Sequence, residues 1–138
     1  MAIWQVNLNF KIQKELDFFN TDFNNSIQAL SNVLPETTSW SDSIKQYGLL
    51  DSTCIEILLD KNNHVEEITL RLDLINFSLY ELECLCEFAI YNNFLMEYEN
   101  ELYTVNKNNF IKIIQKSDAL KFLENPQEFL NSLKTDNI

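Results

Sequence analysis

Few residues in this sequence have side chains of the kind that catalyse reactions. His64 is the sole histidine of the 138 residues, and it ends the polar segment 61–64, which predicts an exposed turn. A Ser–His–Asp or Cys–His site would depend on this one imidazole, and no nearby residue qualifies as its nucleophile. A phosphate-binding glycine loop is excluded because Gly48 is the only glycine. We therefore expect a protein that is not an enzyme and uses no cofactor.

Acidic side chains are the other candidates for chemistry, and the chain has 21 of them against ten lysines and arginines. Glu97 and Glu99 could form a general acid–base pair, but so many acids in a small protein produce such pairs by chance. No segment has the spacing of a calcium-binding loop. Cys84 and Cys86 lie two apart on a predicted helix and point in different directions, so they make a poor metal site. The sequence predicts no metal centre.

The only arginine, Arg71, lies in the middle of a predicted strand and has acidic neighbours. Alternation in residues 65–74 places Arg71 and Asp73 on one face of this strand and the leucines on the other. A hairpin turn at 61–64 pairs residues whose numbers sum to about 125, so Glu56 lies diagonal to Arg71. A guanidinium can engage a carboxylate in a bidentate way that lysine cannot. We expect Arg71 to neutralise Glu56, Asp73 or both, with no role in binding.

The acids are concentrated in one part of the chain. No basic residue lies between Arg71 and Lys107, while seven acids lie in this interval. Such a belt is either a solvated face that keeps the protein soluble or a patch that attracts a basic partner. We expect Glu97 and Glu99 to share one strand face, with Glu101 in the turn beyond them. The acids that we predict to bind a partner are Glu83, Glu87, Glu97, Glu99 and Glu101.

Aromatic residues accompany two of these acids on the predicted helix 78–92. At about 100° per residue, its core stripe consists of Leu79, Leu82, Leu85, Cys86, Ala89 and Ile90. The opposite side carries Glu83 and Glu87 together with Cys84 and three aromatic residues, Tyr80, Phe88 and Tyr91. Aromatic residues are enriched at protein interfaces and at their energetic hot spots. We predict that these three are partner-binding anchors, unless a C-terminal helix covers them.

The strands that must position these residues follow from alternation and turn signals. We expect them at 2–12, 53–60, 65–74, 94–99 and 102–105. The second hairpin is predicted to turn around Asn100 and Glu101. Segment 35–43 is predicted to be a polar loop. Tyr47 and Gly48 are predicted to form a turn, with a positive φ at the glycine.

The helices follow from apolar periodicity and from capping residues. One is capped by Asp22 or Thr21, and a second is capped by Asn76 or Ser78. The C-terminal third is helical at 107–116, at 118–123 with Ser117 as its cap, and at 126–134 with Asn125 as its N-cap and Pro126 at the first helical position. The order β-α-β-β-α-β-β-α-α predicts a single α+β domain over 1–138, with helices packed on a mostly antiparallel sheet.

Composition limits the compartment and the partners. The formal net charge of −11 opposes binding to nucleic acid and to anionic membranes. No apolar run approaches the roughly 18 residues that cross a bilayer. An odd number of cysteines without a CxxC pair favours a reducing cytoplasm, and because the N-terminal residues lack the basic and apolar regions of a signal peptide we expect no secretion. Asn, Lys and Ile provide 40 of the residues, which indicates an AT-rich genome, and we expect a bacterial source.

The chain resembles the small immunity proteins of bacterial polymorphic-toxin systems in its size, its acidity, its low glycine content and its α+β pattern. The resemblance extends over the full length but rests on no motif, so no site residue is transferred from that family. It implies a cytoplasmic protein that blocks the active site of a toxin, or an adjacent surface, by steric and electrostatic occlusion.

Two other functions remain open. A small-molecule or peptide-binding domain would have a pocket between sheet and helices, lined by Trp4, Trp40, Tyr47 and Arg71. A homodimeric scaffold protein would bury the aromatic side of helix 78–92 in a two-fold contact.

Overall fold

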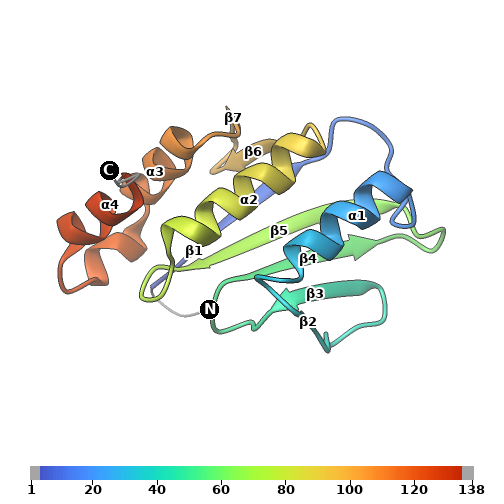
Figure 1. Ribbon diagram of the computed structural model, residues 1–138, viewed down its shortest axis with the longest axis horizontal. Coiled ribbons are helices and arrows are strands. Elements are labelled where there is room, and N and C mark those ends of the chain that lie inside the picture. The colour runs from blue at the N-terminus through green and yellow to red at the C-terminus, as the bar shows by residue number, and fades with distance from the viewer. Residues whose placement is uncertain (1–3, 135–138) are drawn as a thin grey trace.

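The computed structural model describes residues 4–134 and has a seven-stranded antiparallel sheet with the order β2-β3-β4-β5-β1-β6-β7. The strands are β1 Gln5–Lys11, β2 Glu36–Thr37, β3 Ile44–Gly48, β4 Cys54–Leu59, β5 Val65–Asp73, β6 Leu95–Tyr98 and β7 Glu101–Thr104. The helices are α1 Thr21–Leu30, α2 Leu79–Tyr91, α3 Lys107–Lys116, the 3₁₀ helix η1 Asp118–Phe122 and α4 Pro126–Lys134. Figure 1 shows α1 and α2 lying across one face of the sheet. The expected α+β fold is confirmed.

Alternating apolar residues in the central strands decide which face of the sheet is buried. In β5, Ile68, Leu70 and Leu72 are fully buried, as the alternation predicts. The β4–β5 hairpin also has the predicted register, because Glu56 pairs with Thr69. β1 begins at Gln5, and residues 2–3 of the strand expected at 2–12 lie outside the described residues.

The β6–β7 hairpin has a different turn from the one expected. Tyr98 pairs with Glu101, and the two residues between them, Glu99 and Asn100, have φ values of 49° and 68°. Two consecutive positive φ values are typical of a type I′ turn. Glu99 therefore lies in the turn and does not share a strand face with Glu97, and Glu101 lies on β7. The prediction was wrong by one position because glutamate is an unusual residue at positive φ.

Strands β2 and β3 lie in the segment that the sequence predicts as loop and turn. Gln46 on β3 is 4% exposed, and its amide donates to the Thr37 hydroxyl at 2.7 Å and to the Gly48 carbonyl at 3.2 Å. Hydrogen bonds between polar residues thus stabilise this edge, and such residues give no apolar alternation to detect. Gly48 has the predicted positive φ, at 85°, but it is the last residue of β3.

Side-chain caps fix where α1 and α2 begin. The cap of α1 is Asn20, whose side chain accepts the backbone N–H three residues further on, and not Thr21 or Asp22. The cap of α2 is Ser78, one of the two expected residues, which forms a complete capping box with Glu81.

The C-terminal segment is helical as expected, with one difference. Segment 118–123 contains a 3₁₀ helix without a side-chain cap, because the Ser117 hydroxyl donates to the Ile114 carbonyl at the end of α3. Asn125 caps α4 by accepting a backbone N–H at 3.1 Å, and Pro126 is the first helical residue, as predicted.

The buried side of α2 differs from the predicted stripe. Phe88, expected on the outer side, is 4% exposed, while Ile90, expected in the core, is 56% exposed. The Phe88 ring packs against Phe10, Phe23 and Phe94, with centroid distances of 6.1, 6.0 and 5.9 Å. The expectation of an exposed Phe88 is wrong because α2 packs against α1, through Phe23, as well as against β1, through Phe10. This second contact buries a residue that a single-stripe plot places outside.

Candidate functional site

A groove between α1 and α2 brings several of the predicted residues together. It has a volume of about 400 Å³, and each helix contributes four residues to its lining. They are Asn25, Ser26, Ala29 and Leu30 from α1, and Cys84, Glu87, Phe88 and Tyr91 from α2. We call this feature the α1–α2 groove. Three predicted partner-binding residues, Glu87, Phe88 and Tyr91, line it.

The α1–α2 groove is held in place by contacts beneath it and at one end. The buried ring of Phe88 forms part of its lining and is fixed by the aromatic cluster described above. Asn92, the C-cap of α2, donates to the Ser26 hydroxyl at 3.0 Å and to the Phe88 carbonyl at 2.8 Å. These hydrogen bonds join the end of α2 to α1. The contacts between the two helices therefore hold the groove in a fixed shape.

Exposed aromatic and acidic side chains border the α1–α2 groove. Tyr91 is 57% exposed and Tyr80 is 65% exposed. Glu83 and Glu87 are also exposed on α2. The Tyr80 hydroxyl and the thiol of Cys84, one turn further along the helix, each change the pKa of the other group. Tyr80 thus lies next to the groove although it does not line it.

The thiol of Cys84 indicates the sign of the electrostatic potential in the groove. Desolvation is the main cause that raises its pKa, the interaction with the Tyr80 hydroxyl lowers it, and Glu87, Glu83 and Glu81 each raise it further. Nearby carboxylates disfavour an anion and favour a cation at the same place. α1 and α2 contain no lysine, arginine or histidine that could offset these charges. The chemistry of the groove is therefore apolar and cation-attracting.

Cys84 should be the one cysteine that a thiol reagent modifies quickly in the native protein. Cys54 is fully buried and Cys86 is 8% exposed, and burial raises their pKa values to about 11 and about 12. Brief treatment with Ellman's reagent should give a single adduct on Cys84, measured by mass spectrometry. The rate should rise with pH because the thiolate is the reactive form and the raised pKa keeps it scarce at neutral pH. Cys84→Ser should remove the adduct; quick modification of Cys54 or Cys86 would contradict their burial.

The three acids of the β6–β7 hairpin do not line the α1–α2 groove. Glu97 pairs with Asn9 of β1, on the face of the sheet opposite to the buried apolar residues. Glu99 is in the turn, and Glu101 forms an ion pair with Lys116 at 3.9 Å. Their role in partner binding stays a prediction, but it belongs to a different surface from that of Glu83 and Glu87.

The α1 side of the groove was not predicted. Asn25, Ser26 and Ala29 lie beside the apolar stripe that packs α1 on the core. Periodicity identifies that stripe, but it does not show which neighbouring helix lies along each flank. One hint was available, because a small residue such as Ala29 leaves space against a neighbouring helix.

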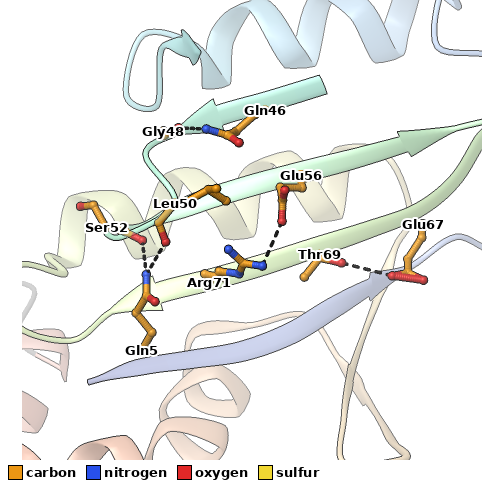
Figure 2. A network of polar contacts seen from close by, with 9 residues as sticks. All are labelled: Gln5, Gln46, Gly48, Leu50, Ser52, Glu56, Glu67, Thr69 and Arg71. Carbon is orange, nitrogen blue, oxygen red and sulfur yellow. Dashed lines mark hydrogen bonds and ion pairs between the residues drawn. The ribbon is translucent and has the colours of Figure 1, made fainter. Parts of the chain in front are cut away.

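Arg71 lies on the face of the sheet opposite to the buried leucines of β5 and points toward Glu56 on the neighbouring strand (Figure 2). Its Nη2 is 3.4 Å from Oε1 of Glu56, and the two side chains are 27% and 12% exposed. The expected pairing with Glu56 is confirmed. The Asp73 carboxylate instead accepts the Ile75 N–H and the Asn76 amide, so it stabilises the turn after β5. Nε of Arg71 makes no hydrogen bond with residues 4–134, so the contact involves only the end of the guanidinium.

Arg71→Ala should lower the free energy of unfolding by about 1–3 kcal/mol, because Glu56 would stay largely buried without its cation. This cost exceeds the ~0–1 kcal/mol of an exposed pair. Arg71→Lys should retain most of the stability, since a single distal contact is replaced. Adding Glu56→Gln to Arg71→Ala should recover part of the loss. Urea unfolding measures all three, and an Arg71→Ala variant as stable as the wild type would contradict the account.

The pocket considered for a small molecule or peptide does not form from its four residues. Tyr47 is 3% exposed and pairs with Ile55, on the face opposite to Arg71. Trp40 is 76% exposed, and Trp4 is half-buried where β1 begins. These side chains do not converge on one hollow.

Comparison with known proteins gives no match: no family model fits the chain, and no curated protein or solved structure is significantly similar to it. Within residues 4–134, no group of three or more His, Cys, Asp or Glu could hold a metal ion. Every helix in this part of the chain is too short or too polar to cross a membrane. The α1–α2 groove is the feature with the clearest binding chemistry.

Proposed function

We propose that this protein binds a basic protein through the surface around the α1–α2 groove and inhibits that partner by occlusion. The observation that carries the proposal is the composition of this surface: an apolar hollow beside exposed Tyr80 and Tyr91, with Glu83 and Glu87 at its border and no basic residue on either helix. Protein interfaces combine desolvated aromatic anchors with peripheral charges in this way.

Electrostatics favour a basic partner and would accelerate its association. The chain carries a net charge of −11, and the carboxylates around Cys84 make the groove itself unfavourable for anions. Complementary charge raises association rates by steering the encounter. The same charge repels nucleic acid and anionic membrane surfaces, which we do not propose as partners.

A protein of this chemistry would act as the immunity proteins do, in the cytoplasm of a bacterium. Occlusion needs neither a cofactor nor a catalytic residue, so the protein is proposed as an inhibitor and not as an enzyme. The three cysteines are free, which suits a reducing compartment.

Charge reversal at the groove should reduce capture of the partner. The tagged wild type is incubated at low salt with lysate and secreted proteins of the source organism, beside Glu83→Lys/Glu87→Lys, and bound proteins are quantified by mass spectrometry. We expect a stoichiometric basic protein that salt releases and that the variant captures at least about tenfold less. Glu124→Lys/Glu128→Lys is the matched control, since it makes the same charge change at exposed residues of another hollow.

Equal capture by both double variants would contradict the proposal, because bulk charge and not the groove surface would then explain binding. Capture of no basic protein would also contradict it. Analytical ultracentrifugation of the wild type, which measures its oligomeric state, tests the remaining alternative. A dimer that Tyr91→Ala dissociates would support the homodimeric scaffold instead.

A further inference from the structure

We infer that the α1–α2 groove receives one bulky apolar side chain of the partner, while a lysine or arginine next to that side chain contacts Glu87 and Glu83. This inference rests on the proposed function and specifies the chemistry of the segment that the protein binds. It commits to a segment of a partner protein as the occupant of the groove.

The size and lining of the groove select a single large side chain. Its volume of about 400 Å³ lies near the lower end of the range for ligand sites, about 300–1,000 Å³. Each helix contributes a small side chain to the lining, Ala29 from α1 and Cys84 from α2, and these leave space for a ligand. The Phe88 ring contributes an aromatic surface to the same lining. An aromatic or long aliphatic side chain would bury its surface there, whereas a whole helix would not fit.

The groove is formed before binding, which lowers the cost of association. Phe88 is held by three ring contacts, and the hydrogen bond from Asn92 to Ser26 joins the helices at one end. The Ser26 hydroxyl also donates to the Phe23 carbonyl, so its polar atom is already paired and does not require a polar ligand group. A pre-organised apolar hollow loses little conformational entropy when it is filled.

The charge around the groove selects a cation beside the apolar side chain. Glu87 lines the groove, and Glu83 lies one turn earlier on α2. Both raise the pKa of the Cys84 thiol inside the groove, which places their field where the ligand would lie. No lysine, arginine or histidine lies on α1 or α2, and within residues 4–134 neither Glu83 nor Glu87 forms an ion pair, so a lysine or arginine of the partner would meet unpaired carboxylates.

Tryptamine and indole-3-acetate test this chemistry directly, because they carry the same ring with opposite charges. Each is titrated into the wild type up to about 10 mM and followed by amide nitrogen–proton correlation spectra. Tryptamine should produce saturable shifts confined to α1 and α2, and indole-3-acetate should bind at least tenfold more weakly. Glu83→Gln/Glu87→Gln should weaken tryptamine about two- to fivefold.

Filling the groove supplies the matched pair of variants. Ala29→Trp should abolish the tryptamine shifts, whereas Gln28→Trp, at the adjacent exposed position that does not line the groove, should leave them unchanged. Wild-type protein that shows no shifts with tryptamine, or equal affinity for both ligands, would overturn the inference whatever the variants do. If that happens while Glu83→Lys/Glu87→Lys still reduces partner capture, the proposed function stands and the partner binds α2 without entering the groove.

Discussion

Phe88→Ala is expected to lower the free energy of unfolding by about 3–5 kcal/mol. The ring is 4% exposed and contacts Phe10, Phe23 and Phe94, so its removal leaves a cavity where α1, α2, β1 and the start of β6 meet. Domains of this size are stable by only about 5–15 kcal/mol, so the change removes a large fraction of the total. The thermal midpoint should fall by roughly 10–20 °C.

Tyr80→Ala on the same helix is the control for this prediction. Tyr80 is 65% exposed, and truncating it should change the stability by about 0.5 kcal/mol or less. Denaturant unfolding of both variants separates a structural aromatic residue from a surface one. If Phe88→Ala were as stable as Tyr80→Ala, Phe88 would be an exposed anchor, as the sequence alone suggests, and the groove would have a different lining.

Gly48→Ala is expected to destabilise the fold by about 2–5 kcal/mol, through two effects. Its φ of 85° lies in the left-handed region, which costs an alanine about 1–2 kcal/mol. A Cβ at this position would also clash with the Thr53 carbonyl oxygen, so the backbone between β3 and β4 must move, at a further cost of about 1–3 kcal/mol.

Asn63→Ala distinguishes these two effects. Asn63 has a φ of 64° in the exposed β4–β5 turn, where alanine meets only the cost of the left-handed backbone. Urea unfolding should show Gly48→Ala to be the less stable of the two by more than about 1 kcal/mol. Equal losses in both variants would mean that the β3–β4 connection relaxes freely around the added methyl group.

Much of the sheet follows from the sequence because its central strands are apolar on one face. The alternation in β1 and β5 predicts which residues are buried, and the polar turn before β5 fixes the register that pairs Glu56 with Thr69. The edge formed by β2 and β3 does not follow, since its buried Gln46 is stabilised by hydrogen bonds. From the sequence alone, a polar segment of this kind is predicted to be a loop, because its hydrogen-bond partners cannot be identified.

The candidate site could be predicted only in part. Exposed Tyr80, Tyr91, Glu83 and Glu87 follow from the helical plot of α2. The groove itself does not, because it depends on how α1 packs along α2, and that contact also buries Phe88. The positions of Glu97, Glu99 and Glu101 on the β6–β7 hairpin were also not predictable, because they depend on a turn in which Glu99 adopts a positive φ.

The rate at which Cys84 is modified, with and without the captured partner, tests the central claim most directly. This thiol lines the α1–α2 groove of the unaltered protein, so the measurement needs no mutation. Saturating partner should slow the modification of Cys84 at least tenfold, while the modification rate of denatured protein stays the same. An unchanged rate in a complex shown to be fully formed would contradict the claim, because the partner would then bind without covering the groove.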